Sequence, residues 1–186
     1  MKYISLGAVA HPSTEHILKV SHCGFEYILT GEQAKLWLDG RFGFANSENP
    51  IEHRTVNHLS RMGLVMITNP YGAGEYRALT KCHIVPAEQN NPYVGLNSDE
   101  KEVLMWLREA GLRLTIAELV FLRDRNIMPS LDLLGQENRQ KLVNQIYTRD
   151  NIFDNLLENQ MELSKVNSGT VKLVLTLLKK KRIILL

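Results

Sequence analysis

NPIEHRTVNHLSRMGLVMITNPYGAGEYRAL, residues 49–79, predicts a short helix, a strand, a glycine-rich turn and a second strand, in that order. The start of the helix has the clearest local chemistry. Asn49 is a good N-cap, Pro50 suits the first helical position, and Glu52 stands where a capping box places an acid. We therefore expect a helix over residues 50–62 that begins at Asn49.

This helix is expected to have two chemically different faces. At helical spacing, Val56, Leu59 and Gly63 fall on one side. The apolar side should face a core and the other side should face solvent. Polar and basic side chains make up that other side, namely Arg54, Asn57, His58 and Arg61.

The residues after the helix predict a strand, a turn and a returning strand. Gly63 suits the position that ends a helix, and residues 64–67 are apolar enough for a strand. The composition of residues 69–74 is typical of a turn. Residues 76–85 are expected to form the returning strand.

The segments HLSRMGLVMI, residues 58–67, and GEYRALT, residues 74–80, resemble the recognition helix and wing of winged helix-turn-helix bacterial regulators. The resemblance covers about the first half of the chain. It implies a wing over residues 68–78 that touches the DNA backbone or the minor groove, with Arg77 as a secondary candidate for contact. It also implies that the helix enters the major groove of DNA through four residues, Arg54, Asn57, His58 and Arg61. The chain departs from the family between Asp39 and Asn49, where there is barely room for the helix that normally precedes the recognition helix.

The composition is that of an ordinary globular chain. Its 186 residues are 44% apolar and 23% charged, which allows one or two domains with a hydrophobic core. No apolar run approaches the ~20 residues that span a bilayer, and residues 1–10 lack the features of a signal peptide. We expect a cytoplasmic protein without a membrane segment. The net charge of +2 is too small to indicate nucleic acid by itself.

The order of patterns predicts an α+β fold in two domains. The first domain, residues 1–88, is expected to be winged-helix-like with an added N-terminal hairpin. Its strands are predicted over residues 3–10 and 16–29, followed by a helix from Gly31 to about Leu38. Residues 87–97, AEQNNPYVGLN, are the best candidate for a linker.

The second domain, residues 97–186, is expected to be rich in helices. Thr115 and Glu118 form a predicted capping box, and a short strand is expected just before it. A terminal strand is expected from residue 183. Helices are predicted over residues 99–110, 116–125, 136–147, 151–163 and 167–181.

Positive charge gathers at the C-terminal end. From Lys165 to Leu186 there are five Lys, one Arg and no acid. Lys165, Lys172 and Lys179 share one direction on the last helix, so they are further candidates for DNA contact. The alternative is a purely structural role, in which these cations stabilise the C-terminal end of the helix by interacting with its dipole. The remaining arc of this helix is apolar, which favours packing or dimerisation.

A weak internal repeat relates the two halves. Residues 32–38, EQAKLWL, resemble residues 101–107, KEVLMWL, and residues 59–67 resemble residues 177–185. In each copy a helix with a Trp comes first, and a later helix runs through basic residues into an apolar strand. Both halves could then be winged-helix-like units, the second with added helices. Chance similarity between amphipathic helices is the competing explanation.

Motifs of catalysis are absent from the sequence, which contains no GxxxxGK[ST], HExxH or GxSxG. The dipeptides His22-Cys23 and Cys82-His83 could form a metal cluster only if their strands paired. Even then, adjacent strand residues point to opposite faces. We therefore expect no catalytic residue, no bound metal and no cofactor.

Two functions from different classes are compatible with these patterns. The first is a transcriptional regulator that binds double-stranded DNA as a homodimer, with Arg and Asn at base edges and other cations on phosphates. The second is a non-catalytic adaptor that binds a protein partner. An exposed apolar patch along Leu173, Leu175 and Leu177 would favour the adaptor. An enzyme or metal-dependent sensor built on the Cys/His dipeptides is a third alternative.

Overall fold

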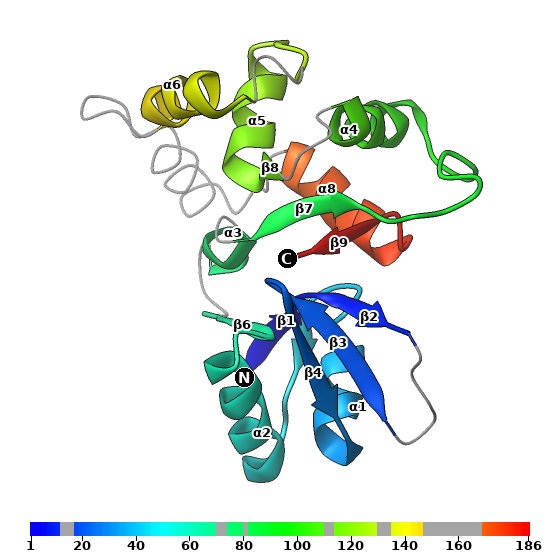
Figure 1. The fold of residues 1–186 in the computed structure, drawn as a ribbon, viewed down its shortest axis with the longest axis vertical. Coiled ribbons are helices and arrows are strands. Elements are labelled where there is room, and N and C mark those ends of the chain that lie inside the picture. The colour runs from blue at the N-terminus through cyan, green and yellow to red at the C-terminus, as the bar shows by residue number, and fades with distance from the viewer. Residues whose placement is uncertain (12–16, 70–73, 80–81, 110–113, 130–134, 147–168) are drawn as a thin grey trace. The chain divides into compact units, whose positions relative to one another are not determined.

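The computed structural model describes residues 1–11, 17–69, 74–79, 82–109, 114–129, 135–146 and 169–186 (Figure 1). The fold is α+β, as expected, and the described strands form three small sheets. Contacts group the chain into two compact units. One is Met1–Pro70 together with Ile184–Leu186, and the other is Tyr71–Ile183.

The first unit combines two sheets with two helices among its described residues. One sheet has the strand order β5-β1-β6 and the other has the order β2-β3-β4. β1 pairs antiparallel with β5 and with β6, two strands that come much later in the chain. In chain order the elements are β1 (Lys2–Ser5), β2 (Ala8–Ala10), β3 (Leu18–His22), β4 (Phe25–Leu29), α1 (Gly31–Asp39), β5 (Ala45–Asn46), α2 (Pro50–Arg61) and β6 (Val65–Thr68).

An apolar cluster forms the core of this unit. Tyr3 and Trp37 are its largest members, and both are fully buried. The Tyr3 hydroxyl donates to the Leu36 carbonyl at 2.9 Å, and the Trp37 indole donates to the Leu6 carbonyl at 3.0 Å. Burial raises the pKa of Tyr3 from 10.0 to about 12, so its hydroxyl stays protonated, and remains a donor, even in moderately alkaline solution. The polar tips of both aromatic residues are thus satisfied inside the core.

The predicted N-terminal hairpin is present in a modified form. Each of the two predicted strands divides, so β1 joins the other sheet while β2, β3 and β4 form a meander. Cys23 and Gly24 connect β3 to β4 with φ angles of 50° and 84°. Two successive left-handed residues are what a type I′ hairpin turn requires. The turn lies within residues 16–29, where the sequence predicts one continuous strand.

The predicted wing is wrong. Gly74–Leu79 form a helix, α3, and the next strand, β7, begins only at His83 (His83–Pro86). β7 lies between β8 and β9 in the third sheet, whereas β6 pairs with β1. Local propensity explains the difference, because residues 75–79, EYRAL, are mostly strong helix formers. The helix also buries Tyr76 and Leu79.

The second unit is rich in helices, as expected. The third sheet has the strand order β8-β7-β9. β8, β7 and the first residue of β9 belong to this unit, whereas the contacts group Ile184 and Leu185 of β9 with the first unit. The predicted capping box is confirmed, since the Thr115 hydroxyl accepts from the Glu118 amide and the Glu118 carboxylate accepts from the Thr115 amide. The helix predicted over residues 151–163 lies outside the described residues. The remaining elements are α4 (Ser98–Glu109), β8 (Leu114–Thr115), α5 (Ile116–Asp124), α6 (Gln136–Ile146), α8 (Gly169–Lys179) and β9 (Ile183–Leu185).

The boundary between the units lies earlier than the predicted linker. Residues 87–97 contain no helix or strand, in keeping with a linker. β7 precedes them, however, and it pairs with β8, so this strand belongs to the third sheet and to neither sheet of the first unit. The contacts accordingly place the division between Pro70 and Tyr71.

The longest described helices, α2 and α4, have 12 residues each, and none of the described helices is both long and apolar enough to cross a bilayer.

Candidate functional site

The outward side of α2 carries the predicted contact residues. Val56 and Leu59 are fully buried in the core of the first unit, so the opposite side of the helix faces away from that core. The two-sided helix predicted from the sequence is therefore confirmed. Four exposed polar side chains occupy this outward side and are named here the α2 face: Arg54, Asn57, His58 and Arg61.

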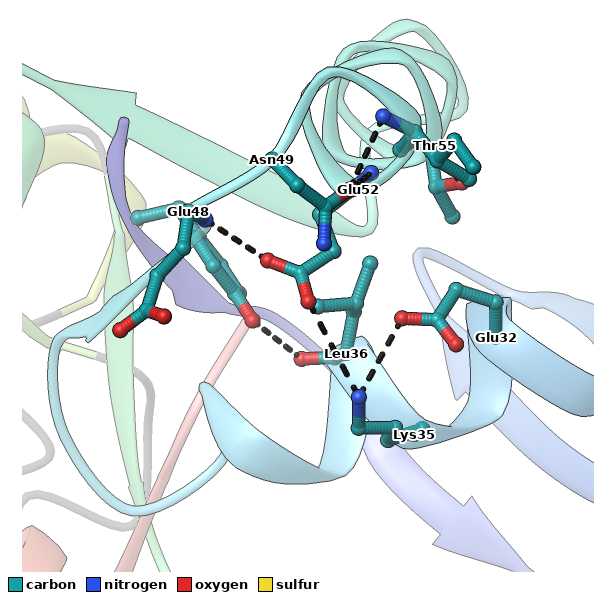
Figure 2. A network of polar contacts seen from close by, with 9 residues as sticks. Glu32, Lys35, Leu36, Glu48, Asn49, Glu52 and Thr55 are labelled. Atoms are coloured by element: carbon teal, nitrogen blue, oxygen red, sulfur yellow. Dashed lines mark hydrogen bonds and ion pairs between the residues drawn. The ribbon is translucent and has the colours of Figure 1, made fainter.

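Polar contacts define where α2 begins (Figure 2). The Asn49 side-chain oxygen accepts from the Ile51 amide at 3.0 Å and from the Glu52 amide at 2.9 Å. Asn49 is therefore the N-cap of α2, as predicted. The Glu52 carboxylate accepts from the Glu48 amide at 2.7 Å. This bond is the main reason that the pKa of Glu52 lies below its usual value, so the side chain stays ionised beside the helix N-terminus.

A lysine on α1 extends this network to the neighbouring helix. Lys35 Nζ lies 3.4 Å from a carboxylate oxygen of Glu32 and 3.9 Å from one of Glu52 (Figure 2). All three side chains are at least partly exposed, so these ion pairs add little to stability. α1 and α2 pack against each other. The direction of the α2 face is thus set mainly by the buried side of the helix.

The α2 face is not committed to contacts within the protein. Among the described residues, Asn57, His58 and Arg61 have no side-chain hydrogen bond or ion pair. Arg54 Nε lies 3.4 Å from the Pro50 carbonyl of its own helix, which is a weak contact. Some other cationic side chains are instead paired within the protein. Arg139, for instance, forms an ion pair with the buried Glu118 at 2.8 Å. The face therefore offers free donors to a partner.

The charge around the α2 face is positive. From His53 to Gly74 the sequence contains no Asp or Glu. The preceding acid, Glu52, stays ionised but faces Lys35 on α1, at 3.9 Å, and has no ion pair with Arg54 or Arg61. Arg54 and Arg61 are thus not neutralised by acids of their own segment. An anionic partner would meet a local field that the net charge of +2 does not reveal.

Ile51 belongs to the same surface and is absent from the predicted set. It is 63% exposed at the start of α2. The spacing of Ile51, Arg54 and His58 places all three on one side of the helix. That periodicity was the signal that could have identified it. Ile51 adds an apolar contact beside the polar donors.

The remaining predicted contact residues lie on other elements. Arg77 is exposed, but it lies on α3 and not on a wing, so its predicted role as a wing residue is wrong. Lys172 and Lys179 are exposed on α8, in the second unit. Lys165 lies outside the described residues. Among the described residues, the structure thus brings together four of the predicted contact residues on the α2 face and two more, Lys172 and Lys179, on α8.

The condition for a Cys/His metal cluster is not met. The dipeptide His22-Cys23 lies at the end of β3, which pairs with β2 and β4. The dipeptide Cys82-His83 lies at the start of β7, in a different sheet. Within the described part of the chain, no three His, Cys, Asp or Glu side chains are placed to hold a metal ion.

The apolar patch that would favour an adaptor is not exposed on α8. Leu177 is fully buried, and Leu173 and Leu175 are half-buried. The apolar arc of this helix is used for packing within the second unit, where α8 contacts α4 and α5.

The α2 face combines positive charge with several kinds of hydrogen-bonding group. The arginines carry planar forks of donors, Asn57 offers both donors and an acceptor, and His58 offers ring nitrogens. Such a set suits a ligand with phosphates and with patterned donors and acceptors. Comparison with protein-family models, with curated proteins and with solved structures finds no match to this chain.

Proposed function

We propose that this protein binds double-stranded DNA through the α2 face and acts as a transcriptional regulator. The observation that supports this proposal is the outward, uncommitted position of Arg54, Asn57, His58 and Arg61 on one helix. In this proposal the first unit is winged-helix-like, α2 serves as the recognition helix, and no β-wing follows it.

The chemistry of the face matches the major groove. The groove of B-form DNA is about 12 Å wide and admits an α-helix. Arginine can donate to both acceptors of guanine, and asparagine can pair with the donor and acceptor of adenine. Arg54, Arg61 and Asn57 therefore supply base recognition, while His58 can donate to a base or a phosphate. Ile51 can contact a thymine methyl group.

A homodimer is part of this proposal. A single helix without a wing makes few contacts with DNA. Two copies related by a two-fold axis would place two α2 faces on two half-sites, which is how helix-turn-helix proteins usually gain affinity. Sedimentation with and without duplex would show whether two chains bind one site.

A protein-binding adaptor is the second candidate function. It is favoured by exposed apolar side chains in the first unit, since Phe25 is 67% exposed and Ile28 is 64% exposed, both on β4. The low net charge also fits this function. Substituting Ile28 by Lys would leave DNA binding unchanged if the α2 face is the interface.

Duplex binding at two salt concentrations tests the proposal. We expect fluorescence anisotropy with a mixed-sequence duplex to show binding at about 50 mM salt and at least tenfold weaker binding at about 200 mM. Arg61→Ala should weaken binding by about 1–3 kcal/mol without loss of structure by circular dichroism, because its side chain is exposed. Lys101→Ala, at an exposed position on α4, is the matched control. Absence of binding at low salt, or unfolding of Arg61→Ala, would reject the proposal.

A further inference from the structure

The two units repeat one order of elements. In the first unit, β1, α1, β5, α2 and β6 form a sheet of order β5-β1-β6 with two helices. In the second series, β7, α4, β8, α8 and β9 come in the same order, with the corresponding sheet order β8-β7-β9. Each series contains an insertion, since β2, β3 and β4 lie between β1 and α1, and α5 and α6 lie between β8 and α8. The same spacing separates Trp37 from the start of β5 and Trp106 from the start of β8. The repeat seen in the sequence therefore has a structural counterpart.

The ends of α2 and α8 match bond for bond. In α2, the Gly63 amide donates to Ser60 and the Leu64 amide to Leu59, both at 3.0 Å. In α8, the Lys181 amide donates to Leu178 and the Arg182 amide to Leu177, both at 2.9 Å. Gly63 and Lys181 are both left-handed, with φ of 77° and 59°. Leu59 is thus the counterpart of Leu177, and α8 is the counterpart of α2.

This register assigns a counterpart to each residue of the α2 face. Arg54 corresponds to Lys172, and Arg61 corresponds to Lys179. Both charges are therefore kept, at the same spacing of two helical turns. The two residues between them are not kept, because Leu175 stands in the place of Asn57 and Thr176 stands in the place of His58.

The exposed surface of α8 is much narrower than that of α2. Lys172 and Lys179 are exposed, while the neighbouring Leu173 and Leu175 are half-buried. The Thr176 hydroxyl donates to the Lys172 carbonyl at 2.8 Å, so it is already used. A helix embedded to this depth cannot insert into a groove. Its two lysine side chains can nevertheless reach outward as flexible point charges.

We propose that Lys172 and Lys179 form a second duplex-binding site, which contacts backbone phosphates and does not read bases. This inference rests on the proposed function of the α2 face. Neither ammonium group has an ion-pair partner among the described residues, and the segment from Leu163 to Leu186 contains no acid. Phosphate is the ligand class that these groups fit, because they offer charge and donors without an acceptor. The first unit then supplies sequence preference, and the second supplies affinity that is independent of sequence.

The test compares the wild-type chain with three paired variants on two duplexes. One duplex has a mixed sequence, and the other is selected from a random pool by the wild type. Lys172→Ala with Lys179→Ala should weaken binding to both duplexes by the same factor. Each lost phosphate contact should also reduce the slope of log affinity against log salt by about one. Lys172→Arg with Lys179→Arg should retain the wild-type slope. Lys101→Ala with Lys141→Ala, at exposed positions on α4 and α6, is the charge-matched control.

Three outcomes would overturn this inference alone, and a fourth would also overturn the proposed function. An unchanged salt slope in the Lys172/Lys179 alanine variant would show that α8 does not touch phosphate. If the wild type still binds the duplexes in that case, the proposed function of the α2 face stands. A selective loss on the selected duplex would show that α8 reads bases. A loss equal to that of the Lys101/Lys141 control would reflect net charge alone. If the wild type binds neither duplex at low salt, the proposed function itself fails.

Discussion

Glu100 is a buried carboxylate whose environment favours its charged form. It is 3% exposed, and both of its oxygens accept from Lys180 Nζ, at 2.9 and 2.6 Å. One of them also accepts from the Asn97 amide at 3.0 Å, while the Asn97 side chain accepts from the Glu100 amide. Asn97 is thus the cap of α4, and Lys180 ties the end of α8 to that cap. The bond from Lys180 is the main reason that the pKa of Glu100 is lowered from 4.5.

Lys180→Ala should destabilise the second unit because it leaves this buried charge without its partner. We expect a loss of about 1–3 kcal/mol at pH 7 in urea unfolding. Since the folded pKa of Glu100 is below the unfolded value, its contribution is present above about pH 4.5 and is lost as pH falls through the folded pKa. The effect of Lys180→Ala should therefore shrink in acid.

Lys179→Ala is the matched control for that experiment. Lys179 precedes Lys180 in the chain, but it is exposed and has no ion-pair partner among the described residues. Its removal should change stability by less than about 0.5 kcal/mol. Equal destabilisation by the two variants would show that the Glu100–Lys180 pair does not hold α8 to α4. The two adjacent lysines thus separate a structural role from the proposed phosphate contact.

At the scale of elements, α2 and α8 end with the same backbone conformation but not with the same residue. Gly63 adopts φ of 77° at the end of α2, where a Cβ would meet no atom within 4 Å. Lys181 adopts φ of 59° at the equivalent position of α8. A left-handed residue with a side chain is strained, whereas glycine is not. Replacing Gly63 by a residue with a side chain should therefore lower stability, whereas replacing Lys181 by glycine should raise it.

Gly63→Ala should destabilise the first unit by about 1 kcal/mol, and Lys181→Gly should stabilise the second by about 0.5–1 kcal/mol. The two tryptophans allow the units to be followed separately, since Trp37 lies in the first and Trp106 in the second. Trp106→Phe and Trp37→Phe backgrounds would each leave one fluorescent reporter. Lys181→Ala is the control, because it removes the side chain without freeing the backbone. A gain from Lys181→Ala equal to that from Lys181→Gly would contradict the role of φ.

Elements with local chemical signals could be predicted from the sequence. The cap at Asn49 and the capping box at Thr115 and Glu118 were identified because each depends on residues within one turn. The buried and exposed sides of α2 followed from its periodicity. α3 was missed because it is short and begins at Gly74, which together with Gly72 suggested a hairpin tip. Helix propensity prevailed there over turn composition.

At the scale of the whole molecule, strand order could not be predicted, because it depends on contacts between distant segments. β1 lies between β5 and β6, and β7 lies between β8 and β9. In each case the central strand precedes both of its neighbours in the chain, which no local pattern reveals. The returning strand expected beside β6 is replaced by β1 for this reason. The candidate site was less affected, since the α2 face depends on one helix and on the core directly beneath it.

Hydrogen exchange offers a test that covers both units at once. On binding a mixed-sequence duplex, exchange should slow in the peptides that contain α2 and α8, because contact with DNA shields and stabilises both helices. α4 should change little, since it carries no proposed contact and its Glu100 is already paired. Lys172→Ala with Lys179→Ala should remove the protection of α8 and leave that of α2. Protection of β4 in place of α2 would instead support a partner that binds at Phe25 and Ile28, and it would contradict the assignment of the α2 face.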